Sequence, residues 1–516
     1  MGDDETIAEQ IFKGSSVTFL GQIAVGVSTF FIKIFLARGL STADFGLLFA
    51  VINLIGFTNT FSHLGMNAAS KKFVSQYVAE DEPRMVRSSV ITALVIVTVA
   101  SLAVSSVFIL ASDFLATSYF GTGEAAPVVI IISVWFFFMS YYHLLANILQ
   151  GFKDFTGNTV GSVLRVFVPV LPVVILVLFF DLNVTVAAFL YLLGPVLSTV
   201  LYYVLLRRRH SEFLFNVGGG GFSRDVGRKM MIFGLPLILS GFATSVIGKI
   251  DTMMLTGLRP LGNVGLFEAA KLTKTSLGFL GGALATPIFP IVSELWTKGD
   301  RGTLRDMMNF MTKFSFLLIL PAALVFLTFP EIVLRVLYGP DYIAAANTMR
   351  IFAGAAVFWS IETVFVGSLS GIGETRLVLK INGSSALFNI VANYLLIPPY
   401  GATGAAMATG LSFLLAFSLA FYYSRREIGF FPEFFPLLKA GGGSLLTLML
   451  IFSVKKVLPL PVWPLLFVSM GSGLIFYMFW IFGTRTILEK DLVTIEENTP
   501  VPKEIVSFLR KYFFRK

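Results

Sequence analysis

The feature that most constrains this chain is a series of apolar segments, each long enough to cross a lipid bilayer as a helix. A span needs about 20 mostly apolar residues, and the 516 residues contain fourteen such segments. Hydrophobic residues make up 56% of the chain and Asp, Glu, Lys and Arg only 13%, against roughly 25% charged residues in soluble proteins. A soluble protein of this length cannot bury that much apolar surface, so the sequence predicts an all-α, polytopic membrane protein. The predicted spans are 14–37, 45–66, 88–111, 126–149, 162–180, 184–206, 231–256, 263–289, 314–334, 344–368, 380–398, 402–423, 437–457 and 462–483.

Lysines and arginines are distributed unevenly among the segments that join these spans. With a cytosolic N-terminus, the inward segments carry 29 of the 39 basic residues and the outward segments carry five. Basic loops are retained on the cytosolic side, so we expect a protein of the cell membrane with both termini in the cytosol. The acidic N-terminus, with no short apolar core behind it, predicts no removable signal peptide.

The two halves of the chain resemble each other at a nearly constant offset. Val74 recurs as Val292 and Arg87 as Arg305, both 218 residues later, and Gly151 recurs as Gly371, 220 residues later. Repeats of six spans each enter the bilayer in the same direction, which predicts two parallel bundles around a central cavity. The expected domains are a first bundle at 1–206, a cytosolic linker at 207–230, a second bundle at 231–424, two additional spans at 425–483 and a basic amphipathic tail at 484–516.

The same composition argues against several classes of protein. The chain has no cysteine and only three histidines, so we expect no metal site and no cofactor. The net charge of +9 is explained by membrane orientation and does not indicate a nucleic-acid partner. The four glycines at 218–221 lack the Gly-Lys-Ser/Thr ending of a phosphate-binding loop, which favours a flexible hinge between the bundles.

Several short motifs resemble polysaccharide flippases of the multidrug/oligosaccharidyl-lipid/polysaccharide exporter superfamily, over about residues 1–425. They are Ala37-Arg38-Gly39-Leu40-Ser41-Thr42-Ala43-Asp44-Phe45-Gly46, Leu64-Gly65-Met66-Asn67-Ala68-Ala69, Gln150-Gly151-Phe152-Lys153-Asp154 and Asn263-Val264-Gly265-Leu266-Phe267-Glu268-Ala269-Ala270. The resemblance implies translocation of a lipid-linked oligosaccharide from the cytosolic to the outer leaflet. Lipid II flippases of the same superfamily also have fourteen spans, but their arginines on the first two spans are not matched here.

Charged residues inside the spans are the candidates for a substrate site, because each costs free energy in lipid and normally faces a cavity or a partner. On the eighth span, Glu268, Lys271 and Lys274 form one helical stripe. Counting about 1.5 Å per residue from Asn263 places Lys274 about 16 Å deep, near the middle of the bilayer. An ion pair with Glu268 would hold Lys271 alone, so we expect these lysines to form a cationic cavity.

Further ionisable residues accompany this stripe. Lys249 and Asp251 lie two residues apart on the seventh span and point to different sides, and Glu362 lies toward the cytosol on the tenth. Lys33 and Arg350 are close enough to the outer surface that snorkelling is an equal alternative. The five basic residues are expected to bind substrate, and the acids Asp251, Glu268 and Glu362 to balance them or couple transport to ions.

Neutral polar side chains add a possible lining for the cavity. They suit hydrogen bonds to sugar hydroxyls, with bonds between helices an equal alternative. Two pairs are four residues apart and therefore expected to share a helix face, Asn59 with His63 and Asn389 with Asn393. The full set is Asn53, Asn59, His63, Asn147, Gln150, Asn389 and Asn393.

A flippase for a polyprenyl-pyrophosphate oligosaccharide, working by alternating access, accounts for these features together. The expected partners are the lipid-linked substrate, membrane lipids and glycan-assembly enzymes, and we expect a monomer. A cation-coupled multidrug exporter is the first alternative, although the first six spans contain no Asp or Glu to bind the cation. A lipid II flippase and a membrane glycosyltransferase are further alternatives; the short outward loops carry no paired acids for catalysis, so we expect no enzyme.

Overall fold

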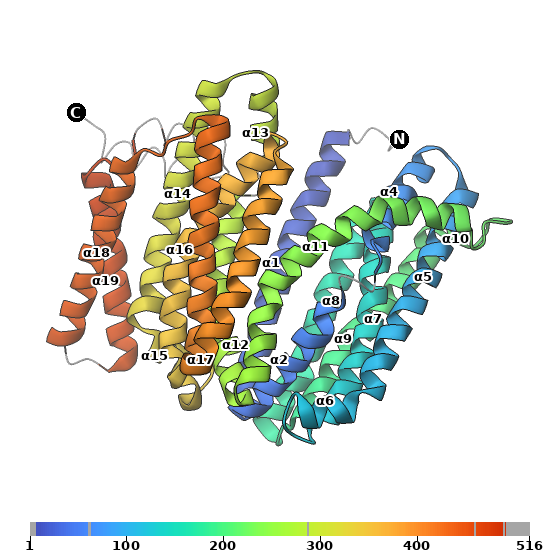
Figure 1. The fold of residues 1–516 in the computed structure, drawn as a ribbon, viewed down its shortest axis with the longest axis horizontal. Coiled ribbons are helices and arrows are strands. Elements are labelled where there is room, and N and C mark those ends of the chain that lie inside the picture. The colour runs from blue at the N-terminus through green and yellow to red at the C-terminus, as the bar shows by residue number, and fades with distance from the viewer. Residues whose placement is uncertain (1–6, 60–62, 286–287, 459–460, 489–490, 492–516) are drawn as a thin grey trace. The chain divides into compact units, whose positions relative to one another are not determined.

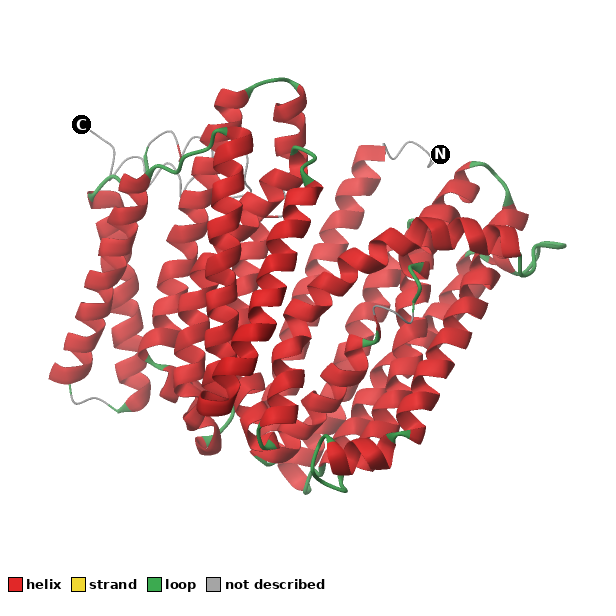
Figure 2. Ribbon diagram, in the orientation of Figure 1, coloured by secondary structure: helices red, strands yellow, loops and turns green. Residues whose placement is uncertain are grey.

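The structure is a computed structural model that describes residues 7–59, 63–285, 288–458, 461–488 and 491. Within these ranges the regular structure is helical and contains no strand (Figure 2). Each predicted span overlaps one or more helices, so the prediction of an all-α, multi-pass membrane protein is confirmed. In that part of the chain, ten helices are long and apolar enough to cross a membrane. Of the predicted basic amphipathic tail 484–516, the structure describes residues 484–488 and 491, and the rest lies outside the described residues.

A first compact unit contains residues 1–269, 337–341 and 397–402. In it, α1 packs on α8, α8 on α9, α9 on α7, and α7 on α5 and α4 (Figure 1). Its helices are α1 (Ile7–Gly39), α2 (Thr42–Phe57), α4 (Met66–Ala79), α5 (Pro83–Leu110), α6 (Ser112–Ser118), α7 (Ala125–Gly151), α8 (Phe155–Phe179), α9 (Val184–Arg209), α10 (Ser211–Leu214), α11 (Arg224–Leu258) and the start of α12 (Leu261–Ala285).

The second compact unit contains residues 270–336, 342–396 and 403–516. Here α14 packs on α16 and α18, α13 on α16, and α18 on α19. Beyond the rest of α12, its elements are α13 (Ile288–Thr297), α14 (Arg301–Thr328), α15 (Pro330–Leu337), η1 (Pro340–Ala345), α16 (Ala346–Gly371), α17 (Thr375–Ile428), α18 (Phe434–Val457) and α19 (Val462–Gly483). The domain boundaries at 206, 230 and 424 rest on sequence likeness and stay a prediction.

Two predicted span boundaries behave differently in the structure. The spans 380–398 and 402–423 run on as α17, with the expected break marked by the non-helical backbone of Gly401 (φ 56°, ψ −130°). The helix of the second span is shorter than expected, because α2 ends at Phe57; Leu64 and Gly65, just before α4, have positive φ. His63 lies in the turn before α4; the expected helix face shared by Asn59 and His63 depends on residues 60–62, which lie outside the described residues, and stays a prediction.

The predicted duplication reappears as contacts that each half makes for itself. A Cβ on Gly151 would lie 2.9 Å from Val74 Cβ, and a Cβ on Gly371 would lie 2.8 Å from Val292 Cβ. Both glycines therefore allow the same close approach between a short helix, α4 or α13, and the end of a span. The turns agree as well: φ is positive at Asp81 and Gly299, 218 residues apart, and at Lys153 and Gly373, 220 apart.

The linker is fastened to α5. Arg87 donates hydrogen bonds to the carbonyl groups of Val217 and Gly219, and Ser88 donates to Gly221 over 2.9 Å. In the second half, Arg305 donates to the carbonyl of Ile428 just after α17, so both repeat-related arginines hold the chain that leaves the sixth span. These hydrogen bonds attach the glycine-rich segment to α5, whereas its composition suggested a flexible hinge.

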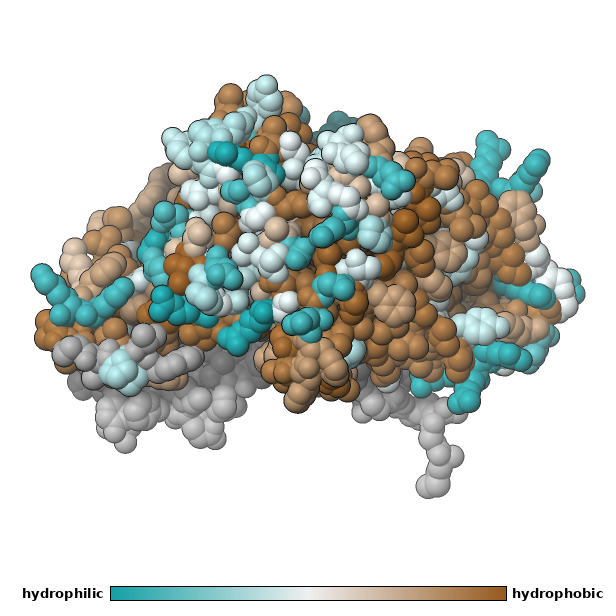
Figure 3. All heavy atoms as spheres, turned by 90° about the horizontal axis from the view of Figure 1, so that it is seen from below, coloured by the Kyte–Doolittle hydropathy of each residue, from teal (hydrophilic) through white to brown (hydrophobic). Residues whose placement is uncertain are grey.

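The surfaces of the spans are apolar, as a membrane requires. Large hydrophobic side chains are exposed along them, among them Leu171 on α8 and Leu395 on α17. Figure 3, seen from below, shows hydrophilic residues mixed with apolar ones on that face. Such exposure in water would promote aggregation, whereas in a bilayer these side chains contact acyl chains.

Candidate functional site

The first part of the candidate site depends on a close crossing of α2 and α12. A Cβ on Gly46 would lie 2.1 Å from the carbonyl oxygen of Leu261, and a Cβ on Gly265 would lie 2.0 Å from that of Thr42. Neither position therefore admits a side chain, and the two helices pack backbone against backbone, as small residues permit in membranes. Both glycines belong to the motifs that carried the resemblance, which gives those motifs a structural reason.

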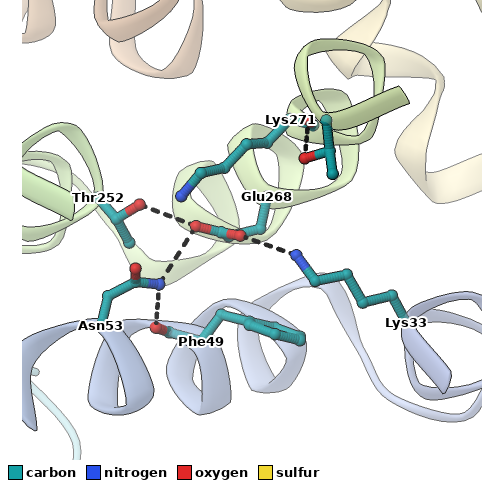
Figure 4. Close-up of polar contacts among 7 residues, drawn as sticks. Lys33, Phe49, Asn53, Thr252, Glu268 and Lys271 are labelled. Atoms are coloured by element: carbon teal, nitrogen blue, oxygen red, sulfur yellow. Dashed lines mark hydrogen bonds and ion pairs between the residues drawn. The ribbon is translucent and has the colours of Figure 1, made fainter. Parts of the chain in front are cut away.

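This crossing places Glu268 of α12 among three donors from three other helices. Its carboxylate accepts hydrogen bonds from Thr252 Oγ1 at 2.8 Å and Asn53 Nδ2 at 3.3 Å, and lies 3.3 Å from Lys33 Nζ (Figure 4). Glu268 is 1% exposed, and a buried carboxylate needs such donors to offset its loss of hydration. The Lys33 ammonium also lies 4.6 Å from the Phe49 ring centre. Lys33 thus pairs with a buried carboxylate instead of extending to the membrane surface; its role in a substrate cavity stays a prediction.

The second part lies in the other unit, around Lys274. Its Nζ lies 5.1 Å from the centre of the Phe413 ring, and that ring stacks on Trp359 with centres 5.4 Å apart and an interplanar angle of 7°. Gly278, one turn along α12, makes room for the indole, because a Cβ there would lie 2.1 Å from a Trp359 ring carbon. Lys271, on the turn before Lys274, accepts a hydrogen bond from Thr275 at its carbonyl oxygen. The Lys274 ammonium is a contact for an anion; Phe413 is only 7% exposed, so the aromatic surface left accessible in this group belongs to the half-buried Trp359.

A third polar group lies inside the first unit. The rings of His63 and His143 are 5.9 Å apart, His143 packs on Tyr142, and the Arg165 guanidinium lies 5.0 Å from the Tyr142 ring centre. Lys249 of α11 donates a hydrogen bond to the carbonyl of Gly56 at the end of α2. His63 is therefore part of a cluster, although sequence alone gave it no partner.

The remaining expected residues are dispersed. Arg350 pairs with Glu331 at 2.5 Å and donates to Asn347 at 2.9 Å, so it joins α16 to α15. Asn389 and Asn393 hydrogen-bond each other at 3.0 Å, which confirms their shared face. Asp251 and Glu362 are buried on α11 and α16. Asn147 Nδ2 donates to the His143 carbonyl, and Gln150 accepts from Lys71 Nζ.

A cluster of charged and titratable side chains surrounds Asp154 at the start of α8. Arg209 Nη1 lies 2.9 Å from Asp154 Oδ2, and His210 Nε2 lies 3.8 Å from the same oxygen. The second distance is a charge contact rather than a hydrogen bond. The nearby His210 imidazole, with the Gly157 N–H and the Arg209 guanidinium, lowers the pKa of Asp154 to about 2, although burial opposes the shift. This cluster joins the start of α8 to the end of α9.

Sequence reasoning did not find three of these contributors. Thr252, His143 and the aromatic pair of Phe413 and Trp359 have ordinary residue types at positions without a distinctive spacing. The only sequence feature that could have pointed to Thr252 is its position directly after the predicted site residue Asp251. Their roles depend on which helices cross, and single-chain periodicity does not contain that information.

Comparison with known proteins gives consistent results. The family model described as polysaccharide biosynthesis protein matches residues 11–296, and a second model, MatE, matches residues 236–395. An uncharacterized membrane protein of Methanocaldococcus jannaschii is 25% identical, over 79% of this chain and 82% of its own length. A probable low-salt glycan biosynthesis flippase of Haloferax volcanii is 27% identical over 31% of this chain and 34% of its own. The solved structure of the lipid II flippase MurJ in an inward closed conformation has a TM-score of 0.74 at 14% identity, over 93% of this chain and 100% of that one.

Proposed function

Because this chain belongs to the polysaccharide biosynthesis protein family, we propose that it is a flippase for a lipid-linked oligosaccharide, carried on a polyprenyl pyrophosphate. It moves the glycan head from the cytosolic to the outer leaflet of the cell membrane, with both termini in the cytosol. The relative from Haloferax volcanii, named as a probable glycan biosynthesis flippase, supports this substrate class.

The observation that carries the proposal is Lys274 beside the stacked rings of Phe413 and Trp359. A pyrophosphate-linked sugar presents an anion next to a ring whose C–H groups pack on the negative face of an aromatic side chain. Lys274 would contact the pyrophosphate, and the half-buried indole of Trp359, backed by Phe413, would contact the first sugar. The lipid tail would stay among acyl chains, so its apolar surface would not have to enter water during transport.

Charge balance supports an anionic substrate. Lys271 and Lys274 follow Glu268 along one helix, and Lys249 adds a third cation on α11. Lys33 already faces the Glu268 carboxylate, so in our proposal it holds that acid in place while the lysines farther along α12 bind the substrate.

The transport cycle we propose is alternating access by the two repeats. Enzymes that assemble glycans on polyprenyl pyrophosphate must act before this step, and enzymes that transfer or polymerise the glycan must act after it. The protein works as a monomer in this scheme, because each chain contains both repeats.

Reconstituted vesicles test the proposal. A fluorescent lipid-linked oligosaccharide is incorporated into both leaflets with the purified protein, and a glycosidase that cannot cross the membrane is added outside. We expect glycans from the inner leaflet to become cleavable in vesicles with the protein and to stay protected in vesicles without it. Continued protection, together with extrusion of a cationic dye by the same vesicles, would instead identify the multidrug exporter.

A further inference from the structure

A groove of about 510 Å³ lies between α5 and the first turns of α11, within the first unit. Its walls are apolar: Ile96 comes from α5, Phe222 from the linker, and Met231, Ile232 and Leu235 from α11. The volume is in the range of pockets that hold small ligands, about 300–1,000 Å³. The proposed function of the protein assigns no role to it.

One face of α11 supplies both the apolar wall and a positive charge. Arg224, Arg228, Met231, Ile232 and Leu235 follow the spacing of a single helical stripe. The two arginines occupy its first turns and line the groove. Ile232 is 64% exposed and Leu235 59% exposed, so this stripe presents uncovered apolar surface that begins at a pair of cations.

The two sides of the groove are fixed relative to each other by contacts that join α5 to α11 and to the end of the linker. Gly227 brings α11 close to α5, because a Cβ there would lie 3.1 Å from Thr92 Cγ2. The backbone N–H of Ser223 donates to Thr92 Oγ1 at 3.1 Å, and Ser88 Oγ donates to the carbonyl of Gly221 at 2.9 Å. Phe222 is fixed between these two bonds. A site whose walls are already fixed loses little conformational entropy on binding.

The position of the groove identifies the leaflet. It adjoins the linker 207–230, which carries six lysines and arginines and which charge bias places in the cytosol. A basic pocket between membrane helices on the cytosolic side suits an acidic lipid headgroup. Asp225 and Lys229 lie on neighbouring faces of the same turns and offset each other, which leaves the charge of the two arginines in excess.

We propose that this groove binds one anionic phospholipid of the cytosolic leaflet, with an acyl chain along Ile96 and Leu235 and the phosphate at Arg224 and Arg228. The lipid would bridge α5 and α11, a helix of the first sequence repeat and the first helix of the second. This proposal does not depend on the identity of the transported substrate.

The test uses the full-length protein in lipid nanodiscs that contain phosphatidylglycerol and phosphatidylcholine, released for native mass spectrometry. We expect the wild type to retain one phosphatidylglycerol in preference to phosphatidylcholine. Two arginines near a membrane surface contribute about 1 kcal/mol each, so Arg224→Ala/Arg228→Ala should weaken retention about thirtyfold. The matched control is Arg207→Ala/Arg208→Ala, which removes the same charge from the exposed end of α9 and should retain the lipid.

Two further arms separate the groove from general charge attraction. Met231→Trp fills the apolar wall and leaves both arginines, and it should release the lipid; glycerol phosphate, which has the headgroup charge without a chain, should not compete. Equal losses in the two double variants would mean nonspecific attraction and would overturn the proposal. Retention by Met231→Trp, or by Arg224→Ala/Arg228→Ala, would overturn it as well.

Discussion

Replacing Lys274 with alanine should weaken substrate binding by an amount that follows from its surroundings. A hydrogen bond between an ammonium and a phosphate contributes about 1.5–3 kcal/mol. In the free protein the Lys274 ammonium lies 5.1 Å from the Phe413 ring centre. Giving up part of this cation–π contact to bind the phosphate costs about 0.5 kcal/mol, which reduces the net contribution of Lys274 to binding. The net loss of about 1–2.5 kcal/mol corresponds to roughly 5–70-fold weaker binding.

The assay is titration of a fluorescent lipid-linked oligosaccharide into the purified protein in detergent, followed by anisotropy. Lys274→Arg keeps the charge and should bind nearly as the wild type does. Lys298→Ala is the matched control, because the Lys298 side chain is exposed and pairs with Glu294, four residues earlier in the chain. If Lys274→Ala binds within twofold of the wild type, or no more weakly than Lys298→Ala, Lys274 does not contact the substrate.

Three other changes should have measurable effects. Lys313 and Asp491 form a buried ion pair at 2.5 Å, so Lys313→Met should lower the free energy of unfolding in detergent by about 3–5 kcal/mol, because it leaves a buried charge unpaired. The double variant Lys313→Met/Asp491→Asn should recover stability, and a double variant as unstable as Lys313→Met would refute the unpaired charge as the cause. Because the pKa of Asp154 is lowered from 3.8 to about 2, its contribution to stability is complete above pH 4 and disappears as the pH falls toward 2; in acid titrations Asp154→Asn should lack this component, and an unchanged profile would contradict it. Finally, Lys271→Ala should reduce flipping in vesicles more than Lys33→Ala, and the reverse order would show that depth along α12 is not the deciding factor.

Much of the fold follows from patterns within single segments. Long apolar runs specify helices that cross the membrane, since a backbone in lipid must satisfy its own hydrogen bonds. The duplication was also legible, and its pairs Gly151 with Val74 and Gly371 with Val292 make matching contacts. The positive φ of Gly65 could not be predicted from the sequence, because it accompanies the close approach of Gly65 to Gly234 of α11.

The candidate site was predicted less completely. The stripe of Glu268, Lys271 and Lys274 is a property of one helix and could be read directly. The donors to Glu268 come from α1, α2 and α11, and only the crossing at Gly46 and Gly265 brings them together. The buried partner of Lys313 lies 178 residues away. Contacts of this kind depend on how helices pack, which charge patterns do not determine.

Photo-crosslinking gives the most direct test that a charged glycan head is handled by α12 and its aromatic neighbours. A lipid-linked oligosaccharide with a photoreactive group on its first sugar is bound to the protein in nanodiscs, irradiated and mapped by peptide mass spectrometry. We expect crosslinks in the peptides that contain Lys274, Trp359 and Phe413, reduced in proportion to binding in Lys274→Ala. Crosslinks confined to lipid-facing residues, with the same yield in both proteins, would contradict the account.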